Sequence, residues 1–222
     1  MTLLALPLLL LVSLLLSDVD ATPRSVVLTD RAWICRGAVD LDLVQVTITP
    51  ASQMKDAVLL RGCSGRIGRI AISNAQCDGV KGSAAGLDVE GGTIDLTRRD
   101  RRRACHKDGI QISGGSRVTF TNVRVRGGGH SGFFVNDASG SGVADVTFVA
   151  GYIGPYPGYD ELFDTDATIG DSDRSGVARS TLCPPRQTRL APDGVYIPST
   201  PSTGGPPARD PIAEGNTYLE SC

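Results

Sequence analysis

The sequence of 222 residues predicts an all-β protein: a single-stranded, right-handed parallel β-helix with rungs of about 23 residues and an irregular C-terminal cap. Glycine is abundant, at 27 residues, aromatic residues make up 5%, and Val, Ile and Thr recur in short runs, which indicates many short strands with tight turns. Three segments recur every 23 residues: GLDVEGG from Gly86, GIQISGG from Gly109 and GFFVNDA from Gly132. No Asn-Gly hairpin turn occurs, which disfavours the competing β-sandwich and jelly-roll folds.

Alternation within each run assigns its inward and outward side chains, because stacked units bury one face that a single unit leaves exposed. The side chains expected to point inward are Leu87, Val89, Ile110, Ile112, Phe133 and Val135. Between them, Asp88, Gln111 and Phe134 are expected to form one outward column. The second strand of each unit recurs as TIDL, RVTF and DVTF, at 93–96, 117–120 and 145–148.

The chain divides into three segments. Residues 1–21 contain the apolar run LLALPLLLLVSLLL and end in a small-x-small pattern, which predicts a signal peptide cleaved after Ala21 and a secreted protein. The alternative is an uncleaved N-terminal anchor, but no second apolar span supports a stable membrane protein. Residues 22–154 are the β-helix domain, and 155–222, rich in Pro and Gly, are a last rung and a capping tail.

Six cysteines remain after the predicted cleavage: Cys35, Cys63, Cys77, Cys105, Cys183 and Cys222. An even number in an exported chain implies three disulfides, and the fifteen formal pairings have to be narrowed by spacing. The first two cysteines are 28 residues apart, and so are the next two, as expected for pairs on adjacent rungs. The last two would then close the tail. No Cys-x-x-Cys pattern occurs, so a zinc site is disfavoured.

The charge is nearly balanced, with a net value of −2, so it gives no reason to expect nucleic acid or an anionic membrane as partner. One local exception is TRRDRRR at 97–103, with five arginines in six positions. This segment is a candidate for binding a polyanion such as an acidic glycan. The alternative is a solvated loop.

The segment DGIQISGGSRVTFTNVRV resembles the rung pattern of the right-handed parallel β-helix proteins, the pectate-lyase-like superfamily, over roughly residues 57–154. His106, Asp108, Gly109 and Gln111 are similar to a His-x-Asp-Gly-hydrophobic-Gln segment of exported bacterial members. Most members cleave or remodel acidic polysaccharides, and others are adhesins or phage tailspikes. The resemblance therefore implies a secreted protein that acts on or binds acidic polysaccharide, with a non-catalytic glycan-binding or cell-surface scaffold as the alternative.

The polygalacturonase branch of the superfamily allows a closer comparison. Its Asn-Thr-Asp-Gly turn corresponds to HKDG here, so Asp108 matches the first aspartate. Its Asp-Asp pair corresponds to the next turn, where His130 and Ser131 replace both carboxylates. Inverting hydrolysis requires a carboxylic acid and a carboxylate across the bond, so this mechanism is disfavoured and a uronan lyase-like activity is the candidate enzyme chemistry.

His106 and Asp108 are candidate catalytic residues, since they could bind a sugar, or Asp108 could orient His106 as a base. The structural alternative is that both shape a corner of the coil. Asp108 would then cap backbone N–H groups before Gly109, and His106 would pack beside the disulfide of Cys105.

His130 is the third candidate catalytic residue, and it follows the three glycines at 127–129, which allow close approach of a ligand. At an offset of 23 residues, His130 stacks over Lys107 and lies diagonal to His106 and Asp108. The rung spacing of about 4.8 Å then brings the histidines to within about 5–8 Å of each other. The alternative is an exposed turn histidine.

Arg124 and Arg126 flank the inward Val125 and are expected to point outward, where they could neutralise a uronate carboxylate. The alternative is a solvated polar face. The other candidate substrate-binding residues are Lys107, Gln111 and Asn136. No cofactor is evident, and the acidic segments 160–166 and 171–173 are the weak candidates for Ca²⁺. A monomer is expected.

Overall fold

The computed structural model of the protein describes residues 24–52, 54–96, 105, 107–137, 140, 142–155, 163–183, 195–196 and 208–219. Within these ranges sixteen strands join one parallel sheet, and no helix occurs. The prediction of an all-β protein with parallel strands is therefore confirmed. The predicted signal peptide, the arginine cluster at 97–103 and His106 lie outside the described residues.

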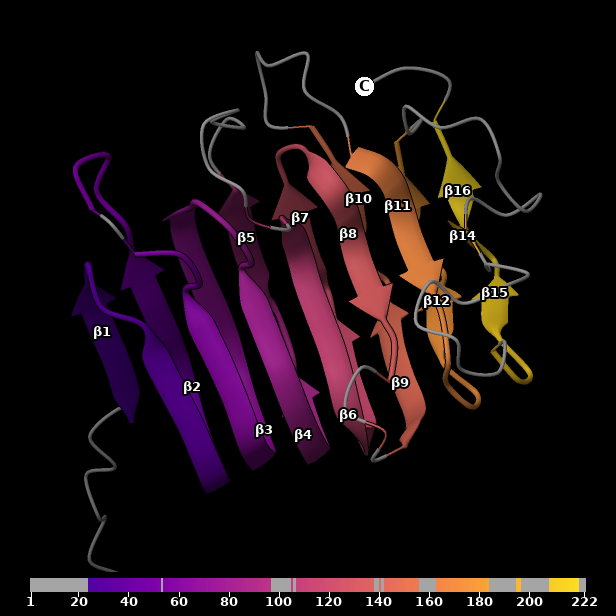
Figure 1. The fold of residues 1–222 in the computed structure, drawn as a ribbon, viewed down its shortest axis with the longest axis horizontal. Helices are drawn as coiled ribbons and strands as arrows, with labels where there is room; N and C mark the ends of the chain where they lie inside the picture. The colour runs from indigo at the N-terminus through magenta and orange to yellow at the C-terminus, as the bar shows by residue number, and fades with distance from the viewer. Residues whose placement is uncertain are drawn as a thin grey trace, which may run out of the picture.

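The strands follow one another in the order β1 (Ser25–Thr29), β2 (Trp33–Thr47), β3 (Val58–Ala75), β4 (Val80–Val89), β5 (Gly92–Leu96), β6 (Asp108–Thr121), β7 (Val123–Arg126), β8 (Gly129–Val135), β9 (Val143–Val149), β10 (Tyr152–Gly154), β11 (Phe163–Ile169), β12 (Gly176–Ala178), β13 (Thr181–Leu182), β14 (Val195–Tyr196), β15 (Ile212–Glu214) and β16 (Thr217–Tyr218). They lie side by side from β1 at one end of the long axis to β14, β15 and β16 at the other (Figure 1).

The sheet is curled, because its longest strands bend and pair with different partners along their length. The first part of β3 pairs with β4, from Val58 beside Val80, and its last part pairs with β5, from Ile70 beside Gly92. Strand β6 likewise pairs first with β8 and then with β9. In Figure 1, β5 and β7 accordingly lie behind β3, β4 and β6. Each circuit of the chain, called a rung here, thus stacks on the previous one.

Three outer faces follow from the strand register, and each is defined by one column of paired residues. Face A carries Ile34, Leu59, Lys81, Gln111, Phe134, Thr168 and Tyr196. Face B carries Asp40, Arg66, Asp88, Thr119, Thr147, Gly176 and Ile212. Face C carries Val27, Gln45, Ala71, Thr93, Arg124, Tyr152, Thr181 and Thr217.

The predicted constant offset of 23 residues is wrong for the coil as a whole. It holds between Gln111 and Phe134, which are paired, but Gln111 pairs on its other side with Lys81, 30 residues earlier. Asp88 instead pairs with Thr119, so it belongs to face B and not to the column of Gln111. The physical reason is the insertion at 97–104, which lengthens one rung and shifts the register that a constant repeat would give.

The second-strand alignment is correct only in part. RVTF and DVTF are paired, with Val118 beside Val146. TIDL is not their equivalent, because Thr93 pairs with Arg124 on face C. The same insertion accounts for the difference, since it separates TIDL from RVTF.

The interior is filled by the alternate residues of every rung, and all six side chains predicted to point inward are buried. Phenylalanines of neighbouring rungs meet at its centre. The Phe133 ring lies 6.4 Å from the Phe120 ring and 5.6 Å from the Phe148 ring, between centroids. This continuous apolar core is what holds the stacked rungs together.

Two disulfides lie within the described residues, and they join Cys35 to Cys63 and Cys77 to Cys105. Both predicted pairings are confirmed, and both link neighbouring rungs. The third predicted pair includes Cys222, which lies outside the described residues. Disulfides persist in oxidising compartments, so the two bonds indicate an oxidising environment for this protein.

The sheet continues beyond residue 154, where a last rung and a capping tail are expected. Strand β11 pairs with β8, β12 with β9 and β13 with β10, and β14, β15 and β16 add a further layer. The described part of 155–222 therefore extends the coil by two rungs. Across the described ranges, no helix has the length and apolar character needed to cross a membrane.

The corner between faces B and C has a left-handed backbone on four successive rungs. The residues there are Asn122, Ala150, Arg179 and Gly215, with φ values of 54°, 53°, 49° and 62°. The backbone N–H groups of the first three bond to the next rung, as Asn122 does to the carbonyl of Val149. The same turn recurs because each rung is laid on the one before it.

Candidate functional site

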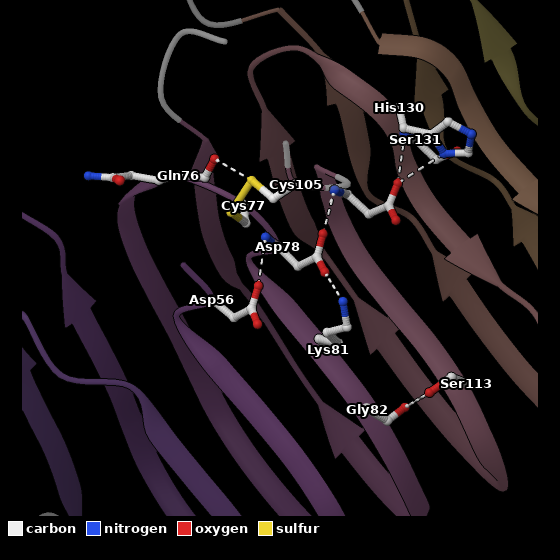
Figure 2. Close-up of polar contacts among 11 residues, drawn as sticks. Asp56, Gln76, Cys77, Asp78, Lys81, Gly82, Cys105, Ser113, His130 and Ser131 are labelled. Carbon is white, nitrogen blue, oxygen red and sulfur yellow. Dashed lines mark hydrogen bonds and ion pairs between the residues drawn. A yellow bond between two sulfur atoms is a disulfide. The ribbon is translucent and has the colours of Figure 1, made fainter. Parts of the chain in front are cut away.

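Three aspartates form a column at the corner where each rung enters face A, and we call Asp56, Asp78 and Asp108 the aspartate column. Each carboxylate accepts a backbone N–H of the following rung: Asp56 from Asp78 at 3.2 Å, Asp78 from Asp108 at 2.8 Å, and Asp108 from Ser131 at 2.9 Å. Figure 2 shows Asp56, Asp78 and Ser131 along a line that crosses the strands. The Asp108 carboxylate thus accepts a backbone N–H of the next rung, whereas the structural alternative placed the capped N–H groups before Gly109.

A short sequence pattern builds this corner: an aspartate, a small residue and an aliphatic residue, as in Asp78-Gly79-Val80. The small residue is required by close packing. A Cβ on Gly79 would lie 2.4 Å from Cγ2 of Ile94, and one on Gly109 would lie 2.4 Å from the carbonyl oxygen of Gly132. At Gly79 and at Gly109, the close approach of the neighbouring residues therefore leaves no room for a side chain.

Asp78 is fully buried and holds a second partner besides the backbone. Its Oδ2 atom lies 2.6 Å from Nζ of Lys81, a residue of the face A column whose side chain is 39% exposed. Burial raises the pKa of Asp78, and this effect exceeds the lowering by Lys81 and by the N–H of Asp108. Burial lowers the pKa of Lys81, but the hydrogen bond and charge of Asp78 outweigh it, so the pKa of Lys81 is raised.

Asp108 also holds His130 in place. Its Oδ1 atom lies 3.2 Å from Nδ1 of His130, and the Asp108 side chain has no exposed surface. The hydroxyl of Ser131 lies 3.2 Å from the same ring nitrogen and 2.9 Å from the hydroxyl of Thr168. In a Ser-His-Asp triad the acid and the nucleophile contact opposite ring nitrogens, so these three residues do not have that geometry.

His130 is the member of this cluster that solvent reaches, because its side chain is 40% exposed. Its ring packs edge-on against Phe134, at 5.6 Å between centroids. Phe134 lies in the face A column beside Gln111, whose Oε1 atom is buried and has no hydrogen-bond partner within the described part of the chain. Face A thus presents a fixed imidazole, an aromatic ring and an amide in one patch.

The predicted proximity of His130 to Lys107 and Asp108 is confirmed for these two residues. The N–H of His130 donates to the carbonyl of Lys107 at 2.8 Å, and Lys107 is itself buried, with 5% exposure. Asn136 is also buried, and its Oδ1 atom accepts the N–H of Asp171 at 3.2 Å. The predicted approach of His106 concerns a residue outside the described ranges.

The two candidate arginines lie on β7, whose neighbours are β5 and β10, and not on face A. Arg126 forms a two-pronged ion pair with Asp95, with Nε and one terminal nitrogen at 2.6 and 2.7 Å from the carboxylate oxygens. Arg124 lies over the ring of Tyr152, at 5.4 Å from its centroid. The structure therefore gives each arginine a protein partner, and places neither in the patch of His130.

Of the two acidic segments that were candidates for Ca²⁺, 171–173 lies wholly within the described residues, whereas residues 160–162 of the other segment do not. Asp171 and Asp173 line a hollow of about 450 Å³ together with Asp137 and Arg209. Asp173 is paired with Arg174 at 2.8 Å. Throughout the described residues, no three His, Cys, Asp or Glu side chains are grouped so that they could hold a metal ion.

Sequence reasoning missed Asp56, Asp78 and Lys81 as neighbours of the site. The signal that would have found them is the recurrence of an aspartate, a small residue and an aliphatic residue at Asp56, Asp78 and Asp108, with Ser131 taking the aspartate position on the next rung. Its spacing of 22, 30 and 23 residues is irregular, so a search at one fixed offset does not detect it.

No family model matches this chain, and neither a curated protein nor a solved structure matches it. Its class is therefore defined by the structure alone. The described residues form an all-β protein whose parallel strands make one curled sheet, with a polar corner beside face A.

The opposite pKa shifts of Asp78 and Glu90 give a pH test. Asp78 has a raised pKa, so the stability linked to it is fully present below its unfolded value of about 3.9 and is lost as pH rises through the folded pKa. The hydrogen bond of Arg66 lowers the pKa of Glu90. The stability linked to Glu90 is therefore fully present above its unfolded pKa of about 4.3, and it is lost as pH falls through the folded pKa.

We therefore expect opposite slopes in two variants. The quantity compared is the free energy of unfolding of each variant minus that of the parent protein. As pH rises from about 3 to about 6, this difference should increase for Asp78→Asn and decrease for Glu90→Gln. Urea unfolding at a series of pH values measures both differences. Slopes of the same sign would contradict the assigned environments.

Proposed function

We propose that this protein is an exported right-handed parallel β-helix of the pectate-lyase-like kind, and that it binds acidic polysaccharide on face A. The observation that carries the proposal is the His130–Phe134 pair, a partly exposed imidazole packed against an aromatic ring and anchored by the buried carboxylate of Asp108. Rings held in fixed positions lose little conformational freedom when a ligand binds.

The chemistry of the patch suits a sugar. The apolar C–H face of a sugar ring packs on an aromatic side chain such as Phe134, and its hydroxyls bond to imidazole and amide groups. The buried Oε1 atom of Gln111 has no partner among the described residues, so a donor that reached it would satisfy it. Lys81, two rungs before Phe134, lies on the same column, where its ammonium group is paired with the buried Asp78.

Binding is favoured over cleavage by the placement of the charged groups. β-Elimination on a uronate requires a base at the C5 proton and a cation at the carboxylate. Asp108 has no exposed surface, the guanidinium of Arg126 is engaged by Asp95, and the ammonium group of Lys81 on face A is engaged by Asp78. The proposed function is therefore the non-catalytic one of the two alternatives, and elimination becomes an outcome of the test.

Calorimetric titration with polygalacturonate and alginate, and with a neutral glucan as reference, tests the proposal. We expect the acidic polymers to bind, the neutral one to bind more weakly, and Phe134→Ala to lower the affinity about tenfold, as for loss of one aromatic contact. The matched control is Tyr152→Ala, which removes an outward aromatic ring from face C instead.

Three results would contradict the proposal: no binding of either acidic polymer, equal losses in the Phe134→Ala and Tyr152→Ala variants, or preference for the neutral glucan. The absorbance of unsaturated uronates is followed in the same samples. If this absorbance increases with the parent protein and does not increase with the His130→Ala variant, the site catalyses elimination, and the proposal of binding alone is wrong.

A further inference from the structure

A second feature of face A is a pair of arginines on neighbouring rungs at its other border. Arg36 and Arg61 are both exposed, and each is followed by a glycine with left-handed backbone, Gly37 at φ 66° and Gly62 at φ 71°. The register pairs Cys35 with Leu60 and Gly37 with Cys63, which leaves Arg36 opposite Arg61 and Gly62. The same corner is thus built twice, with an arginine on each rung.

The disulfide between Cys35 and Cys63 holds these two corners together. Both cysteines are buried directly beside the arginines, and their Cα atoms are 5.4 Å apart. The two guanidinium groups therefore extend from backbone positions on adjacent strands, which lie about 4.8 Å apart. Like charges on neighbouring strands disfavour each other, and the disulfide, together with the ladder between β2 and β3, holds the two positions side by side.

Arg36 and Arg61 share the lack of an ion pair with other exposed arginines of the described chain, such as Arg69 and Arg179, and what sets them apart is that they lie opposite each other on adjacent rungs. Three further arginines are paired with carboxylates. Arg66, Arg126 and Arg174 each hold a carboxylate through two nitrogens, on Glu90, Asp95 and Asp145. Arg36 and Arg61 have no ion pair within the ranges that the structure describes. Between them and the entry corner of face A, Ile34 is 45% exposed, so the arginines border an accessible strip of the column.

We propose that Arg36 and Arg61 form an anion-binding subsite that takes acidic groups of the same polysaccharide chain that contacts Phe134. This inference rests on the proposed function, and it adds the direction of the bound chain and the source of its charge preference. Arginine suits the task because its planar guanidinium binds a carboxylate through two parallel hydrogen bonds.

The spacing of the rungs sets the length of ligand that can use both places. Leu59, beside Arg61, is separated from Phe134 by three strand-to-strand steps, through Lys81 and Gln111. At about 4.8 Å for each step the separation is about 14 Å along the column. A ligand that contacts both must therefore be longer than a disaccharide and run along the coil, across the strands.

The test compares polygalacturonate with digalacturonate, by calorimetry at low and at raised salt. In the double variant Arg36→Gln with Arg61→Gln, we expect the affinity for polygalacturonate to fall about fivefold and its salt dependence to weaken. The affinity for digalacturonate, which contacts the His130–Phe134 pair alone, should not change. The charge-matched control is Arg69→Gln with Arg179→Gln, which removes two exposed arginines from other corners of the coil.

The outcomes separate this inference from the function on which it rests. Parent-like affinity and salt dependence in the Arg36/Arg61 variant, with binding lost in Phe134→Ala, would overturn the subsite and leave the proposed function intact. Equal losses in the Arg36/Arg61 and control variants would assign the effect to net charge and also overturn it. Failure of the parent protein to bind either ligand would overturn both proposals. Unchanged thermal unfolding of each variant confirms that its fold is kept.

Discussion

Replacing Phe133 by alanine should lower the free energy of unfolding by about 4 kcal/mol, within the range of about 3–5 kcal/mol for a fully buried phenylalanine. The Phe133 side chain has no exposed surface. It packs against the ring of Phe120, from the preceding rung, and against the ring of Phe148, from its own rung. Its removal would leave a cavity where these rungs meet, and the stacked backbone can close such a cavity only in part.

Phe134 provides the matched control, because it is the next residue of the same strand and the same residue type. Phe134 points outward and is only partly buried, so Phe134→Ala should lower the free energy of unfolding by about 1 kcal/mol or less. Urea-induced unfolding of both variants, followed by circular dichroism, measures the difference. Losses of equal size would contradict the assignment of inward and outward residues in β8.

Removing the disulfide of Cys77 and Cys105 should have the second largest effect. The bond closes a loop of 28 residues, and the entropy of that loop in the unfolded chain corresponds to about 3.5 kcal/mol. This rung carries the insertion at 97–104, so the bond also fixes where the chain re-enters face A, three residues before Asp108. We therefore expect Cys77→Ala with Cys105→Ala to unfold at markedly lower urea concentration.

The disulfide of Cys35 and Cys63 is a built-in comparison, because it spans the same 28 residues. Its removal should destabilise the protein by a similar amount if loop closure dominates. Near-parent stability of the Cys77/Cys105 variant, or a difference of several kcal/mol between the two pairs, would contradict this account. Such a difference would assign the stabilisation to local packing and not to the unfolded chain.

Local features of the sequence were sufficient for the rungs themselves. Alternation in GIQI and GFFV predicted the burial of Ile110 and Phe133, because inward and outward positions follow directly from strand geometry. Equal cysteine spacing predicted both described disulfides, since bonded cysteines must lie on neighbouring rungs. The contact between His130 and Asp108 was also predictable, because no insertion separates these two rungs.

The register across insertions was not predictable from a constant repeat. The segment at 97–104 lengthens one rung, and this moved Asp88 to face B and brought Lys81 beside Gln111. Left-handed residues at corners were a second difficulty. Ala150 and Arg179 share one such corner with Asn122, although turn propensity alone favours Gly or Asn there.

The sequence by itself determined that this chain forms short parallel strands with a buried apolar face, and that two pairs of cysteines join neighbouring rungs. Only the tertiary structure decided which residues share an outer face, because register is fixed by the pairing of whole rungs and changes with every insertion. The pairing of the rungs stacks the residues of the aspartate column, brings Arg126 into contact with Asp95 and places His130 beside Phe134. The candidate site is therefore a product of stacking, and its residues become neighbours only when the rungs are in register.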